Sequence, residues 1–149
     1  MRTLLPLVLL ALSCIPAPQQ ARIEVTETWA SPTPGGADIS AGYLTITNHG
    51  AEADRLVSAE SARASSVELH SMDMEGGVMR MRAIDGAAIA PGEALTLAPG
   101  GEHLMFVGLT APFTEGEVIP VRLHFEKVGD IDVSLPVRRP GATQTGHGG

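Results

Sequence analysis

The stretch His70-Ser-Met-Asp-Met-Glu-Gly-Gly-Val-Met-Arg-Met-Arg82 predicts a β-hairpin. Two adjacent glycines commonly form the two-residue turn between antiparallel strands. With Gly76-Gly77 as the turn, Met72 pairs with Met81 across the hairpin. Because side chains alternate along a strand, one face carries His70 together with four thioethers: Met72, Met74, Met79 and Met81.

The opposite face of this predicted hairpin is polar and typical of a solvated surface. It carries four polar side chains, Ser71, Asp73, Arg80 and Arg82. The register places Asp73 opposite Arg80, where the two side chains can form an ion pair. On the first face, His70 becomes a diagonal neighbour of Met81, within reach of long side chains.

The segment His103-Leu-Met105 repeats this pairing of imidazole and thioether on a second predicted strand. Residues two apart on a strand point the same way, about 6.6 Å apart along the backbone. We therefore expect His103 and Met105 to face one ion, and Leu104 to point the other way, into the core.

Two imidazoles and two thioethers favour a soft monovalent ion. Methionine sulfur is soft and uncharged, so it selects Cu(I) over Mg²⁺ or Ca²⁺. Zinc sites prefer thiolate, imidazole and carboxylate ligands. The predicted centre is therefore a Cu(I) site of four side chains: His70, Met81, His103 and Met105.

The same residue types also have a simpler interpretation. Methionine at alternate strand positions commonly fills a core or forms a soft apolar rim, and this applies to Met72, Met74 and Met79 taken singly. His49 and His124 are interpreted as structural histidines. The paired spacing of His and Met on two separate strands favours a metal site over packing alone.

The rest of the chain predicts a single antiparallel β-sandwich. Eleven prolines and seventeen glycines separate short β-rich runs, and no segment of ordinary helix length has a convincing apolar stripe. Nine strands are expected: 23–29, 42–48, 56–61, 66–74, 78–84, 94–97, 103–109, 118–125 and 131–137.

The first 21 residues have the layout of a secretory signal peptide. Arg2 gives a positive start, residues 4–12 are apolar apart from one proline, and small and polar residues follow. The apolar run is too short to span a bilayer. We expect residues 1–21 to be removed, residues 22–138 to form the domain, and residues 139–149 to form a flexible tail.

Cys14, the only cysteine of the chain, lies within that leader. Cleavage downstream of it leaves no disulfide and no thiolate ligand. In the alternative interpretation Cys14 is the lipidated first residue of a lipoprotein, although the preceding Ala-Leu-Ser matches the usual lipidation sequence poorly. We expect a periplasmic protein, with anchoring through Cys14 as the less favoured alternative.

The mature chain is acidic. Without Arg2, 9 basic and 17 acidic residues remain, which is a formal charge of −8. Such a surface disfavours nucleic acid and anionic membranes as partners. We expect no nucleic acid partner, no membrane insertion after removal of the leader, and a monomer.

The spacing of these His and Met residues resembles the motif of the periplasmic copper chaperones called PCu(A)C. The family motif is a His, ten residues, a Met, twenty-one residues, then His-any-Met. His70, Met81 and the segment His103-Leu-Met105 match it in residue type and spacing. The resemblance covers roughly residues 23–137 and includes three similar flanking segments: 74–81, 98–101 and 103–109.

The resemblance implies a cupredoxin-like Greek-key β-sandwich with one Cu(I) on the residues matching His70, Met81, His103 and Met105. It also implies delivery toward the binuclear copper site of cytochrome c oxidase, through subunit II or a thiol-bearing copper chaperone. Some family members bind Cu(II) on a C-terminal His- and Met-rich extension. Here the last residues offer only His147, so that second site is not expected.

The residues alone leave other functions open. A blue-copper electron carrier requires a Cys thiolate, and no cysteine follows residue 14. A cell-envelope interaction module could use the methionine face as a protein interface, and a copper buffer would bind the ion without delivering it. An enzyme is disfavoured, because the spacing singles out no nucleophile motif, phosphate loop or carboxylate pair.

Overall fold

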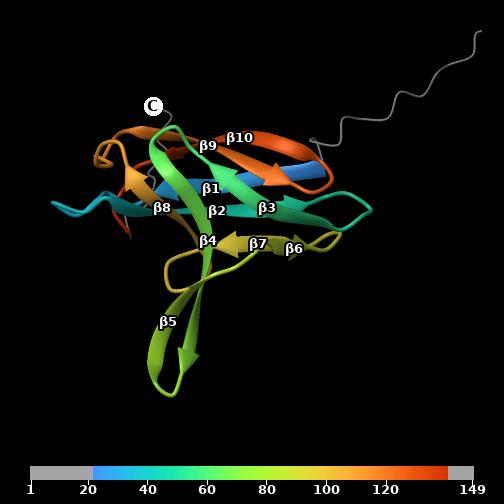
Figure 1. The fold of residues 1–149 in the computed structure, drawn as a ribbon. Helices are drawn as coiled ribbons and strands as arrows, with labels where there is room; N and C mark the ends of the chain where they lie inside the picture. Colours follow the sequence, from blue (N-terminus) through green and yellow to red (C-terminus); the bar gives the residue numbers. More distant parts are fainter. Residues whose placement is uncertain (1–21, 141–149) are drawn as a thin grey trace, which may run out of the picture.

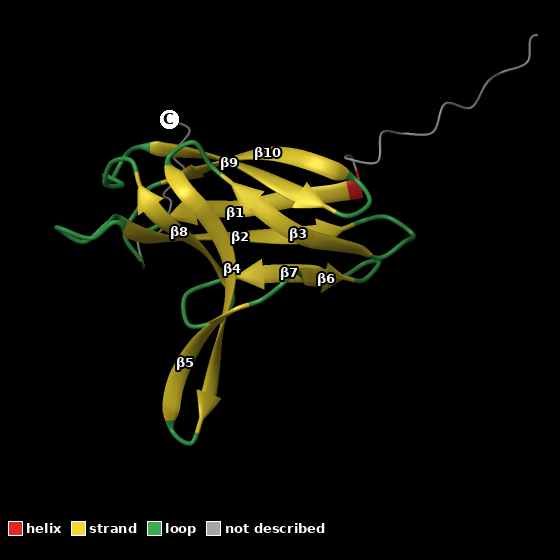
Figure 2. Cartoon of the chain, viewed as in Figure 1, coloured by secondary structure: helices red, strands yellow, loops and turns green. Residues whose placement is uncertain are grey.

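The computed structural model describes residues 22–140, which lie almost entirely in strands and connecting loops (Figure 2). The strands in this part of the chain are β1 (Ile23–Ala30), β2 (Ile39–Asn48), β3 (Asp54–Glu60), β4 (Ala64–Glu75), β5 (Val78–Ala83), β6 (Ala87–Ile89), β7 (Ala94–Leu97), β8 (His103–Leu109), β9 (Val118–Phe125) and β10 (Gly129–Pro136). All nine predicted strands are confirmed. The sequence did not predict β6, because three residues are too few to show an alternating pattern.

Two expectations concern residues that the structure does not describe. The predicted signal peptide, with Cys14, lies outside the described residues, and so does most of the predicted tail. Between residues 22 and 140, no helix has the length and apolar character needed to cross a membrane.

The strands form one antiparallel sheet that almost closes on itself. Its order is β1-β2-β8-β4-β3-β9-β10, with β5, β6 and β7 attached beside this path. A parallel bridge between Ala30 and Val137 joins the two ends of the order. Figure 1 shows β9 and β10 lying over β1 and β2. The predicted all-β, single-domain sandwich is therefore confirmed as a near-closed barrel.

Alternate side chains of the strands fill the interior of the barrel. Leu104 and Phe106 of β8 are 1% and 0% exposed, which confirms that Leu104 points into the core. Gly42 of β2 lies against this core: a Cβ there would be 2.7 Å from Phe106 Cε2 and 2.8 Å from Leu135 Cδ2. A glycine is therefore needed for β2 to approach β8 this closely.

A β-bulge in β1 sets the position of its tryptophan. Thr26 pairs with Thr45, but three residues later Trp29 pairs with Tyr43, so β1 carries one extra residue. Glu27 within the bulge has a φ of 53°, and its carboxylate accepts a hydrogen bond from Thr45 Oγ1 at 3.0 Å. The bulge brings Trp29 and Tyr43 together on the face of the sheet opposite the core residues.

Strands β4 and β5 form a ribbon that projects from the barrel (Figure 1). Their register pairs Met72 with Met81 and Met74 with Met79, as the sequence predicts. The predicted Asp73–Arg80 ion pair is replaced by two diagonal pairs: Arg80 with Glu75 at 3.6 Å, and Arg82 with Asp73 at 3.4 Å. The right-handed twist of a two-stranded ribbon shortens one diagonal and so explains the change of partner.

Candidate metal centre

The two predicted imidazoles lie side by side where the projecting ribbon leaves the barrel. His70 of β4 pairs with His103 of β8 in antiparallel register. Their ring centroids are 5.7 Å apart, with 39° between the ring planes. Direct cross-strand partners share one face of a sheet, so the fold brings together two histidines that are far apart in the sequence.

In each imidazole one ring nitrogen is hydrogen-bonded to the protein, and the other is available to bind a metal ion. His103 Nδ1 lies 3.1 Å from the carbonyl oxygen of Gly101, so Nδ1–H donates and Nε2 keeps its lone pair. His70 Nε2 lies 2.7 Å from Glu68 Oε2. His70 Nδ1 is buried and has no hydrogen-bond partner among the described residues. An unsatisfied buried polar atom costs about 1–3 kcal/mol, and a metal ion would satisfy this one.

The two predicted thioethers lie on either side of His70. Met105 is 9% exposed and pairs with Glu68, which places it one diagonal step from His70. Met81 is 49% exposed and pairs with Met72, again one diagonal step away. Diagonal neighbours are about 7–8 Å apart at the backbone, a span that a methionine side chain and a metal–sulfur bond can cover. The assignment of these residues as ligands stays a prediction.

A row of two aromatic rings, Tyr43 and Trp29, lies beside His103. The sequence did not predict this row. The Tyr43 ring lies 6.4 Å from the His103 ring, and Trp29 lies 4.5 Å from Tyr43. The Arg138 guanidinium stacks 4.5 Å above Trp29 in a cation–π contact. This row restrains the His103 ring. Finding it requires the pairing of β2 with β8, for which the sequence carries no local signal.

The other histidines of residues 22–140 each contact a carboxylate elsewhere on the surface. His49 Nε2 lies 2.6 Å from Glu24, and His124 Nδ1 lies 2.6 Å from Asp130. The hydrogen bond that His124 donates to Asp130 raises the pKa of His124 above its ordinary value, against a smaller opposing effect of burial. These contacts agree with the structural interpretation of both histidines. Over the described residues, no three His, Cys, Asp or Glu side chains form a group that could hold a metal ion.

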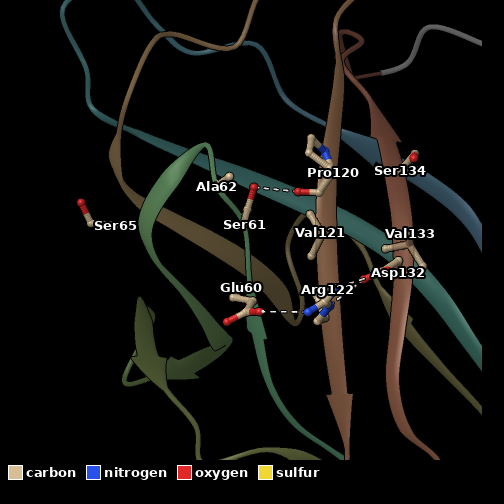
Figure 3. Close-up of a pocket in the computed structure, with 10 residues that line it drawn as sticks. All are labelled: Glu60, Ser61, Ala62, Ser65, Pro120, Val121, Arg122, Asp132, Val133 and Ser134. Carbon is tan, nitrogen blue, oxygen red and sulfur yellow. Dashed lines mark hydrogen bonds and ion pairs between the residues drawn. The ribbon is translucent and has the colours of Figure 1, made fainter.

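An open groove lies between the end of β3 and strands β9 and β10 (Figure 3). Arg122 crosses it, 2.8 Å from Asp132 and 3.9 Å from Glu60, and holds the pKa of Asp132 below its usual range. Ser61 Oγ donates to the carbonyl oxygen of Pro120 at 2.7 Å. The lining carries one positive side chain, Arg122, two negative ones, Glu60 and Asp132, and no sulfur, so the groove is a poor candidate for a soft metal.

Comparison with known sequences gives one family and two relatives. The family described as "LpqE-like: Putative lipoprotein LpqE-like" matches residues 23–137. "Putative lipoprotein Lxx21020" of Leifsonia xyli subsp. xyli is 34% identical over 124 residues, which cover 83% of this chain and 74% of the relative. "Uncharacterized protein RP573" of Rickettsia prowazekii is 25% identical over 113 residues, or 73% of this chain and 62% of the relative.

Solved structures with the same fold include copper-bound proteins. The copper-bound PCuAC domain from PmoF2 superposes with a TM-score of 0.69 at 25% identity, covering 80% of this chain and 94% of that domain. The Cu(I) form of DR1885 from Deinococcus radiodurans has a TM-score of 0.54 at 30% identity, covering 78% and 79%. The near-closed antiparallel barrel is thus the fold of these PCuAC domains.

Proposed function

The chain belongs to the LpqE-like family and is a PCuAC-like copper-binding domain, and we propose that it carries one Cu(I) ion and passes it to an acceptor by ligand exchange. The proposed ligands are His70, Met81, His103 and Met105. The PCuAC copper chaperones are not enzymes, in agreement with the expectation from the sequence.

One observation carries the proposal: His70 and His103 lie with their rings 5.7 Å apart, and the buried Nδ1 of His70 has no partner among the described residues. Two imidazole nitrogens and two thioethers form a neutral shell of soft and borderline ligands, which favours Cu(I) over Cu(II). The solved Cu(I) form of DR1885 supports the same oxidation state here.

Ligand exchange requires one ligand that can leave without disturbing the others. Met81 meets this requirement, because it is 49% exposed whereas His103 and Met105 are 5% and 9% exposed. When Met81 swings away, a coordination position opens to solvent, where a thiolate or imidazole of the acceptor can bind. Because a thioether does not protonate in water, the two imidazoles set the pH dependence of binding.

The destination of the copper is the finer part of the proposal. We propose export to the periplasm and delivery toward the binuclear copper site of cytochrome c oxidase, through subunit II or a thiol-bearing chaperone. The lipoprotein descriptions of the matching family and of the Leifsonia relative support export. Anchoring through Cys14 stays the alternative to a freely diffusing periplasmic protein.

Competition with a Cu(I) chelator tests the proposal. The mature protein should hold one tight equivalent of Cu(I), and the double variant Met81→Ala/His103→Ala should lose it. The control variant His49→Ala removes an imidazole that lies far from the proposed metal centre, and it should bind Cu(I) as the wild type does. A wild type without a tight equivalent, or a double variant that keeps it, contradicts the proposed site. Tight binding without transfer to a thiol-bearing acceptor contradicts delivery and favours a copper buffer.

A further inference from the structure

Four methionines of the β4–β5 hairpin form two rungs that lead away from the imidazole pair. Met72 faces Met81 nearer the barrel, and Met74 faces Met79 nearer the tip. Cross-strand partners have Cβ atoms about 4.5–5.5 Å apart, and successive rungs are about 6.8 Å apart along the strands. We call these four residues the thioether ladder. Its inner rung is one step along β4 from His70.

The thioether ladder is not part of the hydrophobic core. Met74 is 70% exposed, and Met79 and Met81 are each 49% exposed. Among the described strands β5 pairs with β4 alone, and Figure 1 shows the hairpin tip far from the barrel. The core-filling interpretation is therefore wrong for Met74 and Met79. Burial, which would favour each such side chain by about 1.5–3 kcal/mol, does not account for their presence.

We propose that the thioether ladder is a second, weaker binding site for a soft monovalent cation, Cu(I) or Ag(I). The thioether is a soft, uncharged ligand that discriminates against hard cations. Methionine has three rotatable bonds in its side chain, so the sulfurs of two facing rungs can converge on one ion. An aliphatic residue at these positions would offer the same apolar surface but no ligand atom.

The opposite face of the hairpin is arranged so that it does not compete for the ion. Asp73 and Glu75 lie within ion-pair distance of Arg82 and Arg80. The two carboxylates are thereby neutralised, and hard divalent cations are not drawn to the tip by charge. The ligand atoms that the tip presents are sulfurs.

The ladder passes its ion inward to the imidazole pair, and this step rests on the proposed function of that pair. Met81 belongs to both sites, so an ion on the inner rung is already bound by one ligand of the proposed centre. Exchange of the remaining thioethers for the nitrogens of His70 and His103 completes the transfer. The copper stays Cu(I) throughout, so no electron donor or acceptor is required.

Titration of the mature protein with Ag(I), and then with Cu(I) under reducing conditions, tests the ladder. Methionine methyl NMR signals report binding at each sulfur. The wild type should bind one tight equivalent and then a second, weaker one that shifts the methyl signals of Met74 and Met79. Met74→Leu/Met79→Leu should lose the second equivalent and keep the first. Val78→Leu, on the polar face of the same tip, is the matched control and should keep both.

The outcomes separate this inference from the proposed function. A His103→Ala/Met105→Ala variant that loses the tight equivalent but still shifts the Met74 and Met79 signals supports both sites. A wild type that lacks the tight equivalent yet shifts those signals contradicts the proposed function alone. Saturation at one equivalent with unmoved tip signals overturns the ladder. So does a leucine variant that keeps both equivalents but no longer binds an acceptor protein, because the ladder is then a protein-docking face.

Discussion

His70 and His103 face each other directly across strands β4 and β8, with their ring centres 5.7 Å apart. Both residues are held by the backbone ladder of the barrel, so binding an ion requires little rearrangement of the imidazoles. In the proposed centre the thioethers supply the adaptable part, because Met81 comes from a ribbon that stands clear of the barrel. Two fixed imidazoles together with one movable thioether suit an ion that must be bound and then released.

Glu68 should strengthen copper binding through His70. Its carboxylate accepts a hydrogen bond from His70 Nε2 at 2.7 Å, and such partners orient a ligating imidazole and raise its basicity. Glu68→Gln should weaken Cu(I) binding by about 10–100-fold, as measured by chelator competition. Glu126→Gln, in the exposed turn after β9, should have no effect. Equal affinities of Glu68→Gln and the wild type would contradict a role for the carboxylate.

Trp29, the only tryptophan of the chain, should report copper binding. Its ring lies 4.5 Å from Tyr43, which lies 6.4 Å from His103. An ion bound at His103 alters the surroundings of this row, so the tryptophan emission should fall as Cu(I) is added. His103→Ala should abolish the change while circular dichroism shows that the fold is retained. Emission that stays constant as copper binds tightly would place the ion away from His103.

Gly42→Ala should destabilise the barrel. The new Cβ would lie 2.7 Å from Phe106 and 2.8 Å from Leu135, both of which are fully buried. Forcing extra volume into a packed core costs about 1–3 kcal/mol, measurable as a lower free energy of unfolding in urea. Gly35→Ala meets nothing within 4 Å and should change stability by less than about 0.5 kcal/mol. Equal stabilities of the two variants would show that β2 can move away from β8.

The pair between His124 and Asp130 should stabilise the fold more at acidic pH than at alkaline pH. The hydrogen bond that His124 donates to Asp130 raises the folded-state pKa of His124 above the ordinary 6.5. The contribution of a raised pKa is fully present below the unfolded value and is lost as the pH rises through the folded value. His124→Gln should therefore lower the free energy of unfolding more near about pH 5.5 than near about pH 8.5.

The size of this difference should be small, about 0.2–1 kcal/mol, because the pair lies near the surface. Urea unfolding of the wild type and the variant at both pH values measures it. A larger destabilisation at the alkaline pH would mean that the neutral imidazole makes the stabilising contact.

Local sequence determined the ribbon and the chemistry of the ligands proposed on it. Gly76 and Gly77 have φ values of 59° and 81°, a conformation that favours glycine, so the turn and the register that follows from it could be predicted. Alternation along a strand then placed His70 and Met81 on one face. The spacing of His103 and Met105 within β8 is local in the same way, and so is the preference of thioethers for a soft ion.

Tertiary structure alone decided what lies beside these residues. The pairing of β4 with β8 brought His70 next to His103, and the pairing of β2 with β8 brought Tyr43 behind it. Whether Met74 lies in a core or in solvent also depends on what covers the ribbon. Turn type and side-chain alternation are properties of neighbouring residues, whereas strand order and burial depend on how distant segments close the barrel. A single sequence therefore specifies turn type and side-chain alternation directly, but it specifies strand order and burial only through the whole fold.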